Sequence, residues 1–173
     1  MGAVPKHVVL VGMMGAGKSA VGRRVAARLV RPFSDSDTVV EDRMGRTVGE
    51  IWRTDGEAAF RQLEAEALQS ALADPAPGVI AAAGGTVIDP GNRAALAGED
   101  TVVIWLRADP QVLLGRVRHG DHRPLLDDDP AGELARLDAE RAELYAEVAD
   151  VVIDVDDLDL DEVATRVLEE IEG

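Results

Sequence analysis

A glycine-rich octapeptide, Gly12-Met13-Met14-Gly15-Ala16-Gly17-Lys18-Ser19, has the residue types and spacing of a phosphate-binding P-loop. It follows an apolar run and precedes a helical pattern, which is the context that such a loop requires. Backbone N–H groups of the glycines can wrap a phosphate chain, and the N-terminus of the next helix adds a favourable dipole. We expect Lys18 to neutralise the β- and γ-phosphates of ATP and the Ser19 hydroxyl to bind Mg²⁺. The residues of this segment assigned to ATP are Gly12, Gly15, Ala16, Gly17, Lys18, Ser19 and Ala20.

Two carboxylates, Asp35 and Asp37, follow a short apolar run that begins after Arg31-Pro32. A parallel sheet presents the carboxyl ends of its strands to ligands, so both side chains are expected near the phosphates. Asp35 could bind Mg²⁺ directly or through water. Asp37 could accept a hydrogen bond from the hydroxyl being phosphorylated and take its proton. The alternative is that Asp37 is an ordinary helix N-cap.

Arg61 and the pair Gly84-Gly85 are candidates for binding an anionic second substrate. Arg61 lies four residues after Glu57 and three before Glu64, so surface ion pairs are the competing explanation. Gly84-Gly85 ends a predicted strand, where free backbone N–H groups can meet an anion without a Cβ in the way. A bare tight turn is the alternative there.

Two further arginines, Arg123 and Arg141, lie in very different surroundings. Arg123 belongs to an irregular stretch, 119–130, with Gly, Pro and three consecutive Asp, which indicates a mobile loop that could close over the phosphates. Arg141 lies on a predicted helix, 133–148, where a solvated face is the alternative. The chain has 33 Asp and Glu against 18 Lys and Arg, so an enzyme for ATP must concentrate positive charge in one cleft.

Short apolar runs alternate with helical patterns along the whole chain, which is typical of a parallel sheet flanked by helices. The expected strands are 8–11, a short run ending near 35, 79–82, 101–106 and 151–154. The expected helices or helix starts are 18–29, Thr47, 57–73, Asp109-Pro110, 133–148 and 159–172. We expect one α/β domain over residues 1–173, because half of this chain would make only a marginal domain.

The helical pattern over 57–73 has a regular apolar spacing, which predicts one buried stripe. Its members are Phe60, Leu63, Ala67 and Ala71. Arg61 and Glu64 fall off this stripe, so the pattern predicts that neither lies in the core.

Several classes of protein are excluded by composition. Cysteine is absent, which excludes a disulfide framework and a thiolate metal site, and the histidines His7, His119 and His122 have no metal-ligand spacing. The acidic net charge of −15 argues against nucleic acid or an anionic membrane as a partner. The apolar run 8–14 is too short for a signal sequence, and nothing approaches the length of a membrane span. We expect a soluble, cytoplasmic monomer.

The motifs together resemble the shikimate kinases, within the nucleoside-monophosphate-kinase-like group of P-loop proteins. The resemblance runs from Val8 to about Asp154, with six elements in family order. They are the P-loop, Phe33-Ser34-Asp35-Ser36-Asp37, Gly56-Glu57-Ala58-Ala59-Phe60-Arg61, Gly84-Gly85, Arg123-Pro124-Leu125-Leu126 and Arg141-Ala142-Glu143-Leu144-Tyr145. The implied fold is a three-layer P-loop kinase with a five-stranded parallel sheet, a substrate-binding segment at about 36–70 and a mobile lid at about 117–130.

The implied activity is transfer of the γ-phosphate of ATP to the 3-hydroxyl of shikimate, in aromatic amino-acid (chorismate) biosynthesis. The implied shikimate-binding residues are Asp37, Arg61, Gly84, Gly85 and Arg141, with the arginines on the carboxylate and Asp37 on the hydroxyls. Arginine offers a two-pronged grip that lysine cannot match. The implied catalytic residues are Asp37, Lys18 and Arg123, and the implied Mg²⁺ ligands are Ser19 and Asp35. Arg123 and Arg116 are further ATP contacts, with Arg116 against adenine.

The sequence departs from the family pattern at three positions, Ala20, Ala83 and Thr86, where Thr, Gly and Ala are usual. Ala83 would be costly if its position needed a positive φ. Two rival functions are a related small-molecule kinase and a regulatory nucleotide-binding protein. A related kinase, such as one acting on gluconate, would lack the Arg61 and Arg141 pairing. A regulatory nucleotide-binding protein without turnover would be expected to have lost at least one of the chemical residues.

Overall fold

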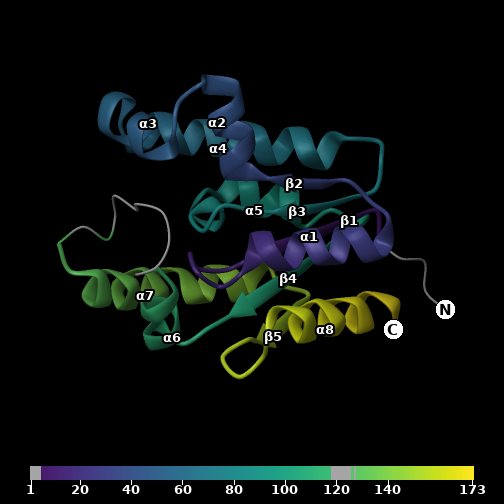
Figure 1. Cartoon of the computed structure of the whole chain (residues 1–173). Helices are drawn as coiled ribbons and strands as arrows, with labels where there is room; N and C mark the ends of the chain where they lie inside the picture. Colours follow the sequence, from purple (N-terminus) through teal and green to yellow (C-terminus); the bar gives the residue numbers. More distant parts are fainter. Residues whose placement is uncertain (1–4, 118–125, 127) are drawn as a thin grey trace.

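Five parallel β-strands form the centre of the computed structural model, which describes residues 5–117, 126 and 128–173 (Figure 1). The strands are β1 His7–Val11, β2 Phe33–Asp35, β3 Gly78–Ala81, β4 Thr101–Arg107 and β5 Val151–Asp154. Their order across the sheet is β2-β3-β1-β4-β5, and every neighbouring pair is parallel. The predicted five-stranded parallel sheet is therefore confirmed.

Strand β1 lies in the middle of the sheet and is buried along its whole length. Val8 pairs with Val79 of β3 on one side and with Val102 of β4 on the other. A strand covered on both faces needs apolar side chains at every position rather than at alternate ones, which is the pattern of 8–11. Because the strands are parallel, the loops after β1, β2 and β3 all leave the sheet at the same edge.

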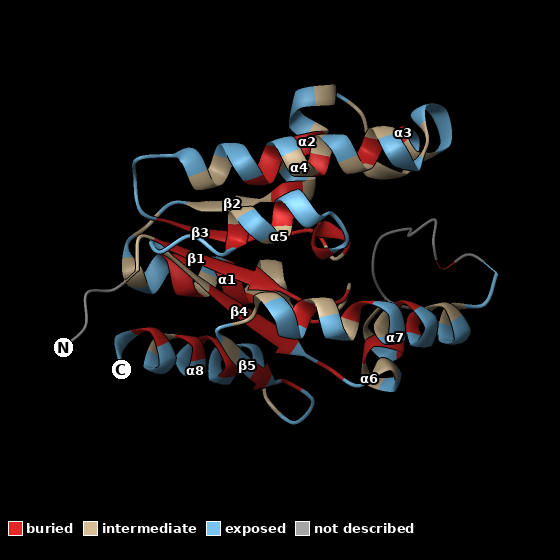
Figure 2. Cartoon of the chain, turned by 180° about the vertical axis from the view of Figure 1, so that it is seen from behind, coloured by how far each residue is buried: buried red, intermediate tan, exposed pale blue. Residues whose placement is uncertain are grey.

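Eight helices are assigned within the described ranges, and they cover both faces of the sheet. They are α1 Lys18–Leu29, α2 Ser36–Met44, α3 Val48–Asp55, α4 Glu57–Ala73, α5 Pro90–Leu96, α6 Pro110–Val117, α7 Pro130–Val148 and α8 Leu160–Glu172. Helices α1 and α8 pack together in front of the sheet in Figure 1, whereas α5 and α7 lie in front in Figure 2, which shows the opposite side. The result is the predicted three-layer arrangement. None of these helices is long and apolar enough to cross a membrane.

The predicted helix boundaries agree closely with the structure. Helices 18–29 and 57–73 begin and end where the sequence pattern placed them. Thr47 caps α3 with the predicted capping box, because its side chain accepts from the Glu50 N–H while the Glu50 carboxylate accepts from the Thr47 N–H. Most of the predicted lid, including Arg123, lies outside the described residues.

Helices α2, α3 and α4 build a small second core beyond the edge strand β2 (Figure 2). Its buried residues are Val40, Ile51, Phe60 and Ala67. The predicted stripe of α4 was partly wrong. Phe60 and Ala67 are buried as expected, but Leu63 and Ala71 are only half-buried, and Glu64 and Leu68 are buried in their place. A hydrophobic pattern cannot predict a buried carboxylate, which needs a cationic partner from the fold.

Val30, directly after α1, is the one described non-glycine residue with a positive φ. Its angles are φ 53° and ψ 47°, and its side chain is 91% exposed. A β-branched residue is strained in this left-handed region and gains nothing here from burial. We therefore expect Val30→Gly to raise the free energy of unfolding by about 0.5–1 kcal/mol, measured by urea denaturation.

Val152 provides the matched control, because it is an exposed valine in the extended strand β5. Val152→Gly should lower the free energy of unfolding by about 0.5–1 kcal/mol, since glycine weakens a strand. A loss of stability in both variants would mean that strain at Val30 is not the dominant effect.

Candidate active site

A cleft of about 670 Å³ opens at the sheet edge where β1, β2 and β3 end, between α1 and the helices α2 to α4. Seven of the predicted site residues line it. They are Ser19, Asp35, Asp37, Arg61, Gly84, Gly85 and Arg141. These residues come from separate segments of the chain, and the parallel sheet brings them together because its strand ends share one edge.

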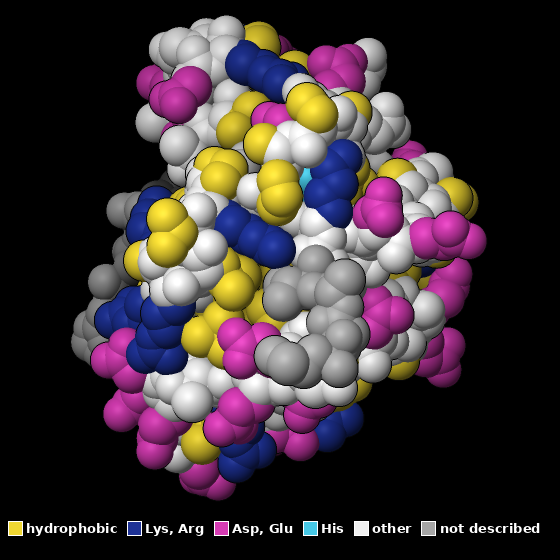
Figure 3. Space-filling model, turned by 90° about the vertical axis from the view of Figure 1, so that its right-hand side faces the viewer, with side chains coloured by type: hydrophobic (Ala, Val, Ile, Leu, Met, Phe, Trp, Pro, Cys, Tyr) yellow, Lys and Arg dark blue, Asp and Glu magenta, His cyan; other side chains and the backbone are white. Residues whose placement is uncertain are grey.

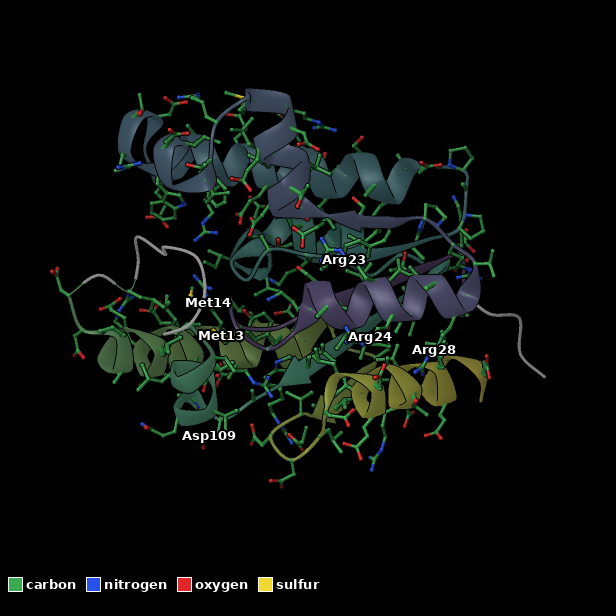
Figure 4. The ribbon with its side chains drawn as sticks, viewed as in Figure 1. Met13, Met14, Arg23, Arg24, Arg28 and Asp109 are labelled. Carbon is green, nitrogen blue, oxygen red and sulfur yellow. The ribbon has the colours of Figure 1, made fainter. Side chains whose placement is uncertain are left out.

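The glycine loop joins β1 to α1 at the base of this cleft, where Met13 and Met14 are labelled in Figure 4. A Cβ at Gly12, whose φ is 144°, would lie 2.6 Å from the backbone oxygen of Leu106, so only glycine fits there. The Lys18 Nζ donates to the backbone oxygens of Gly12 and Met13 at 2.7 and 2.9 Å and so lies along the loop. The Arg116 guanidinium donates to the Gly15 oxygen at 3.2 Å, which ties α6 to the same loop.

Ser19 and Asp35 are in direct contact, since the serine hydroxyl donates to Asp35 Oδ2. The other oxygen, Oδ1, accepts from the backbone N–H groups of Asp37 and Thr38 at 3.0 and 3.3 Å. Asp35 is thus the N-cap of α2, and Asp37 lies in the first turn. The alternative that Asp37 is the N-cap is wrong.

The hydroxyl and carboxylate of this pair are the hard oxygen ligands that Mg²⁺ prefers. Across the described ranges no group of three or more His, Cys, Asp or Glu side chains could hold a metal ion. Beside nucleotides, Mg²⁺ commonly completes its shell with phosphate and water oxygens.

Arg61 makes both ion pairs that its spacing allows, to Glu64 at 2.8 Å and to Glu57 at 3.6 Å. They are not both surface pairs, because the Glu64 side chain is 2% exposed. Burial raises the pKa of Glu64 to about 6, although the neighbouring Arg61 guanidinium favours the charged carboxylate. The Arg61 guanidinium also lies 5.5 Å from the centre of the Trp52 ring. It is therefore held in place at the cleft wall.

Arg141 is buried, with 2% of its surface exposed, which excludes the solvated-face alternative. Its Nε has no hydrogen-bond partner among the described residues. One turn further along α7, the Tyr145 hydroxyl donates to the Gly84 oxygen at 2.5 Å, and burial raises its pKa to about 12. A buried cation with an unused donor at a cleft wall is suited to bind an anion.

Gly85 leaves space for a neighbouring side chain and is not required by its own backbone angles. Its φ is −86°, which any residue can adopt, but a Cβ would lie 1.9 Å from Arg61 Nη1. The absent side chain leaves room for the guanidinium. Ala83 has no positive φ, so the substitution of the usual glycine causes no backbone strain there.

Glu64, Trp52 and Arg23 are among the cleft residues that had no site role assigned from the sequence. Tyr145, which bonds the Gly84 oxygen, had none either. Trp52 had a usable signal, because aromatics make up only 3% of the chain and this one precedes Arg61 by a short spacing. Arg23 extends from α1 toward β2, where its guanidinium lies 5.0 Å from the Phe33 ring centre (Figure 4). Arg24, the next residue, points to α8 instead.

A glycine loop that follows the central strand of a β2-β3-β1-β4-β5 sheet, with a lysine folded along it, is the arrangement of a P-loop kinase. The family model for shikimate kinase matches residues 14–172, and the chain belongs to the shikimate kinase family. The shikimate kinase of Symbiobacterium thermophilum is 46% identical over 169 residues, which are 96% of each chain. That of Ruegeria pomeroyi is 42% identical over 96% of this chain and 85% of its own.

Solved structures agree with this assignment. A shikimate kinase from Acinetobacter baumannii in complex with shikimate superimposes with a TM-score of 0.93 at 33% identity, covering 98% of this chain and 94% of that one. A gluconokinase from Sinorhizobium meliloti has a TM-score of 0.65 at 22% identity and shares the fold alone.

The buried Glu64 predicts a pH dependence of stability. Between its ordinary pKa of 4.5 and the folded value of about 6, the folded state binds more protons than the unfolded state, so stability falls as pH rises through this window. The Glu64→Gln variant lacks this titration. We expect the wild type to lose about 2 kcal/mol relative to Glu64→Gln between pH 4 and pH 7, measured by urea unfolding.

Glu57→Gln is the matched control, because it removes an exposed carboxylate that pairs with the same arginine. The compared quantity is the difference in unfolding free energy between the wild type and each variant. If this difference depends on pH equally for Glu57→Gln and Glu64→Gln, the pH dependence does not come from Glu64.

Proposed function

We propose that this protein transfers the γ-phosphate of ATP to the 3-hydroxyl of shikimate, giving ADP and shikimate 3-phosphate for aromatic amino-acid biosynthesis. The observation on which the proposal rests is the position of Arg61 and Arg141 with Asp37 in the cleft beside the glycine loop. Two arginines suit a carboxylate, and an aspartate beside the phosphate loop suits a hydroxyl acceptor. Shikimate has both groups on one small ring.

The two arginines would hold the acceptor by its carboxylate. Arg141 is buried with an unused Nε donor, and Arg61 is held against Glu64 and Trp52. Both guanidinium groups lie beside Gly84-Gly85, whose backbone N–H groups can add hydrogen bonds. Because these groups are already held by the fold, little side-chain entropy is lost when the acceptor binds.

Phosphoryl transfer at this site would depend on positioning and on charge. Lys18 is held beside the glycine loop and would neutralise the charge on the γ-phosphate during transfer. Asp37 would orient the acceptor hydroxyl and take its proton. Holding two reactants in attack geometry can remove about 7–11 kcal/mol from a barrier. We assign Arg123 to the transferring phosphoryl group and Arg116 to adenine, the latter because it already contacts the loop through Gly15.

We assign Mg²⁺ to Ser19 and Asp35, which present adjacent oxygens at the end of β2 and the start of α1. Mg²⁺ would supply charge neutralisation of the phosphates at this position. We further propose one domain with a substrate-binding segment at about 36–70 and a lid at about 117–130, acting as a monomer in the cytoplasm. The separate small core of α2, α3 and α4 supports treating that segment as a unit.

Coupled ADP release with shikimate, quinate and gluconate tests the acceptor. We expect rapid ADP release with shikimate only. Turnover with gluconate in place of shikimate would favour the gluconate-kinase alternative. ATP binding without acceptor-dependent ADP release would favour a regulatory protein.

Asp37→Asn should reduce turnover by at least about a hundredfold while ATP binding stays close to that of the wild type, since the amide cannot take the proton. Turnover is measured by ADP release and ATP binding by calorimetry. Asp42→Asn, at an exposed position of the same helix, is the control. Strong residual activity of the Asp37 variant would remove it from the base or orienting role.

Arg61→Lys should raise the KM for shikimate about tenfold or more with a smaller effect on the KM for ATP, because lysine loses the forked contact with a carboxylate. Arg53→Lys is the matched control, since Arg53 lines the same cleft while its Nε bonds the Gly49 oxygen. An unchanged KM in the Arg61 variant would leave Arg61 with only its ion pairs.

A further inference from the structure

Tyr145 lies behind the wall of the acceptor cleft, one turn of α7 beyond Arg141. It is the single tyrosine of the chain, and it is 1% exposed. Its ring packs against Trp105 of β4, with the ring centres 5.5 Å apart. A phenylalanine ring would fill the same space, and a buried hydroxyl is unfavourable unless it forms a hydrogen bond. The partners of the hydroxyl therefore indicate what this residue does.

The Tyr145 hydroxyl holds the peptide that joins Gly84 to Gly85. It donates to the Gly84 oxygen at 2.5 Å. Burial raises the pKa of Tyr145 to about 12, so the hydroxyl stays protonated and remains a donor near neutral pH. No described peptide bond is cis, and the C=O and N–H of a trans peptide point in opposite directions. The Gly85 N–H therefore points away from Tyr145, and no described residue accepts a hydrogen bond from it.

Arg141 is the second group beside the Tyr145 hydroxyl. Lys and Arg side chains lie at the surface among Asp and Glu on the face that Figure 3 shows, whereas Arg141 is buried. Four positions separate Arg141 from Tyr145, so both lie on one face of α7. The guanidinium acts on the pKa of Tyr145 in the opposite direction to burial, by its charge and by a hydrogen bond. A phenolic oxygen can accept from a guanidinium while it donates to a carbonyl.

Gly84 itself lies against the same guanidinium, since a Cβ at this glycine would be 3.4 Å from Arg141 Nη1. Gly84, Gly85 and Arg141 all line the cleft. Tyr145 and Gly84 are 61 positions apart, and Arg141 belongs to α7 whereas the glycines follow β3. The hydroxyl therefore connects two distant segments at the part of the cleft that suits a carboxylate.

We propose that Tyr145 is a positioning residue for the carboxylate of the acceptor. Its hydroxyl holds the Arg141 guanidinium and the Gly84-Gly85 peptide as one unit, so that the guanidinium and the Gly85 N–H donate to the same anion. Packing on Trp105 keeps the hydroxyl in place. This inference rests on the proposed function, because it concerns how the same site binds its acceptor.

The kinetic test uses Tyr145→Phe, which keeps the ring and its packing and removes only the hydroxyl. We expect the KM for shikimate to rise about fivefold or more, the effect of losing one hydrogen bond, while kcat and the KM for ATP change by less than about twofold. Binding of shikimate is not abolished, because Arg61 is held separately by Glu64. Urea unfolding verifies that the variant is folded at the assay temperature.

Thr86→Val is the matched control. Thr86 follows Gly85 directly and is fully buried, but its Oγ1 has no hydrogen-bond partner among the described residues. This variant also removes one buried hydroxyl beside the glycine pair. We expect its KM for shikimate to stay within about twofold of the wild type. An equal rise of KM in both variants would mean that any change of packing near Gly85 has this effect, and would overturn the proposal.

Methyl shikimate separates a positioning role from a merely structural one, because the ester keeps the hydroxyl groups of shikimate and lacks the charged carboxylate. Tyr145→Phe should lower kcat/KM about fivefold or more for shikimate and less than about twofold for the ester. A general loosening of α7 would lower kcat/KM equally for both acceptors, and this result would overturn the proposal.

The amide signal of Gly85 tests the contact directly, in ¹H–¹⁵N NMR spectra with saturating ADP. We expect shikimate to shift this signal in the wild type and to shift it by less than half as much in Tyr145→Phe at saturation. Equal shifts, or an unchanged KM in an active Tyr145→Phe enzyme, overturn the inference. A wild type that neither turns over nor binds shikimate would count against the proposed function instead.

Discussion

Parallel pairing of β1 with both β3 and β4 is the constraint on which the rest of the structure depends. It makes β1 the buried centre of the sheet. The glycine loop that follows β1 therefore lies at the middle of the edge formed by the strand ends. Because β2 and β3 end at this edge too, Asp35 and Gly84-Gly85 arrive beside the loop although they are far apart in the chain. The helices then close the cleft by covering the faces of this sheet.

Charge is distributed very unevenly in this molecule. The chain has a net charge of −15, but Arg141 is buried in the cleft wall and Arg61 lies against Gly85. Glu64 holds Arg61 from within the core, at the cost of a carboxylate whose pKa is raised to about 6. Burying an ion pair is rarely favourable by itself, so its benefit here is the fixed position of the guanidinium. That position suits recognition of a planar carboxylate.

Helix α4 connects several parts of the molecule. Phe60 and Ala67 complete the small core with α2 and α3, and Arg61 and Glu64 face the acceptor cleft. Further along, Ala71 lines a second cavity together with the buried His7 of β1. One helix therefore lines both the cleft and this cavity. This relation depends on packing, because the residues involved come from β1, β2, α2 and α4.

The sequence by itself determined the order and type of most elements, the glycine loop and the family, because local patterns encode these directly: period, capping residues and a contiguous phosphate motif. Helix α5, Pro90–Leu96, was not predicted. It also named seven of the residues that line the cleft. Only the tertiary structure decided that Glu64 and Arg141 are buried, that Asp35 rather than Asp37 caps α2, and that Gly85 makes room for Arg61. These features depend on contacts between segments distant in the chain, and a charged residue on a helix has the same local pattern whether its partner lies in solvent or in the core.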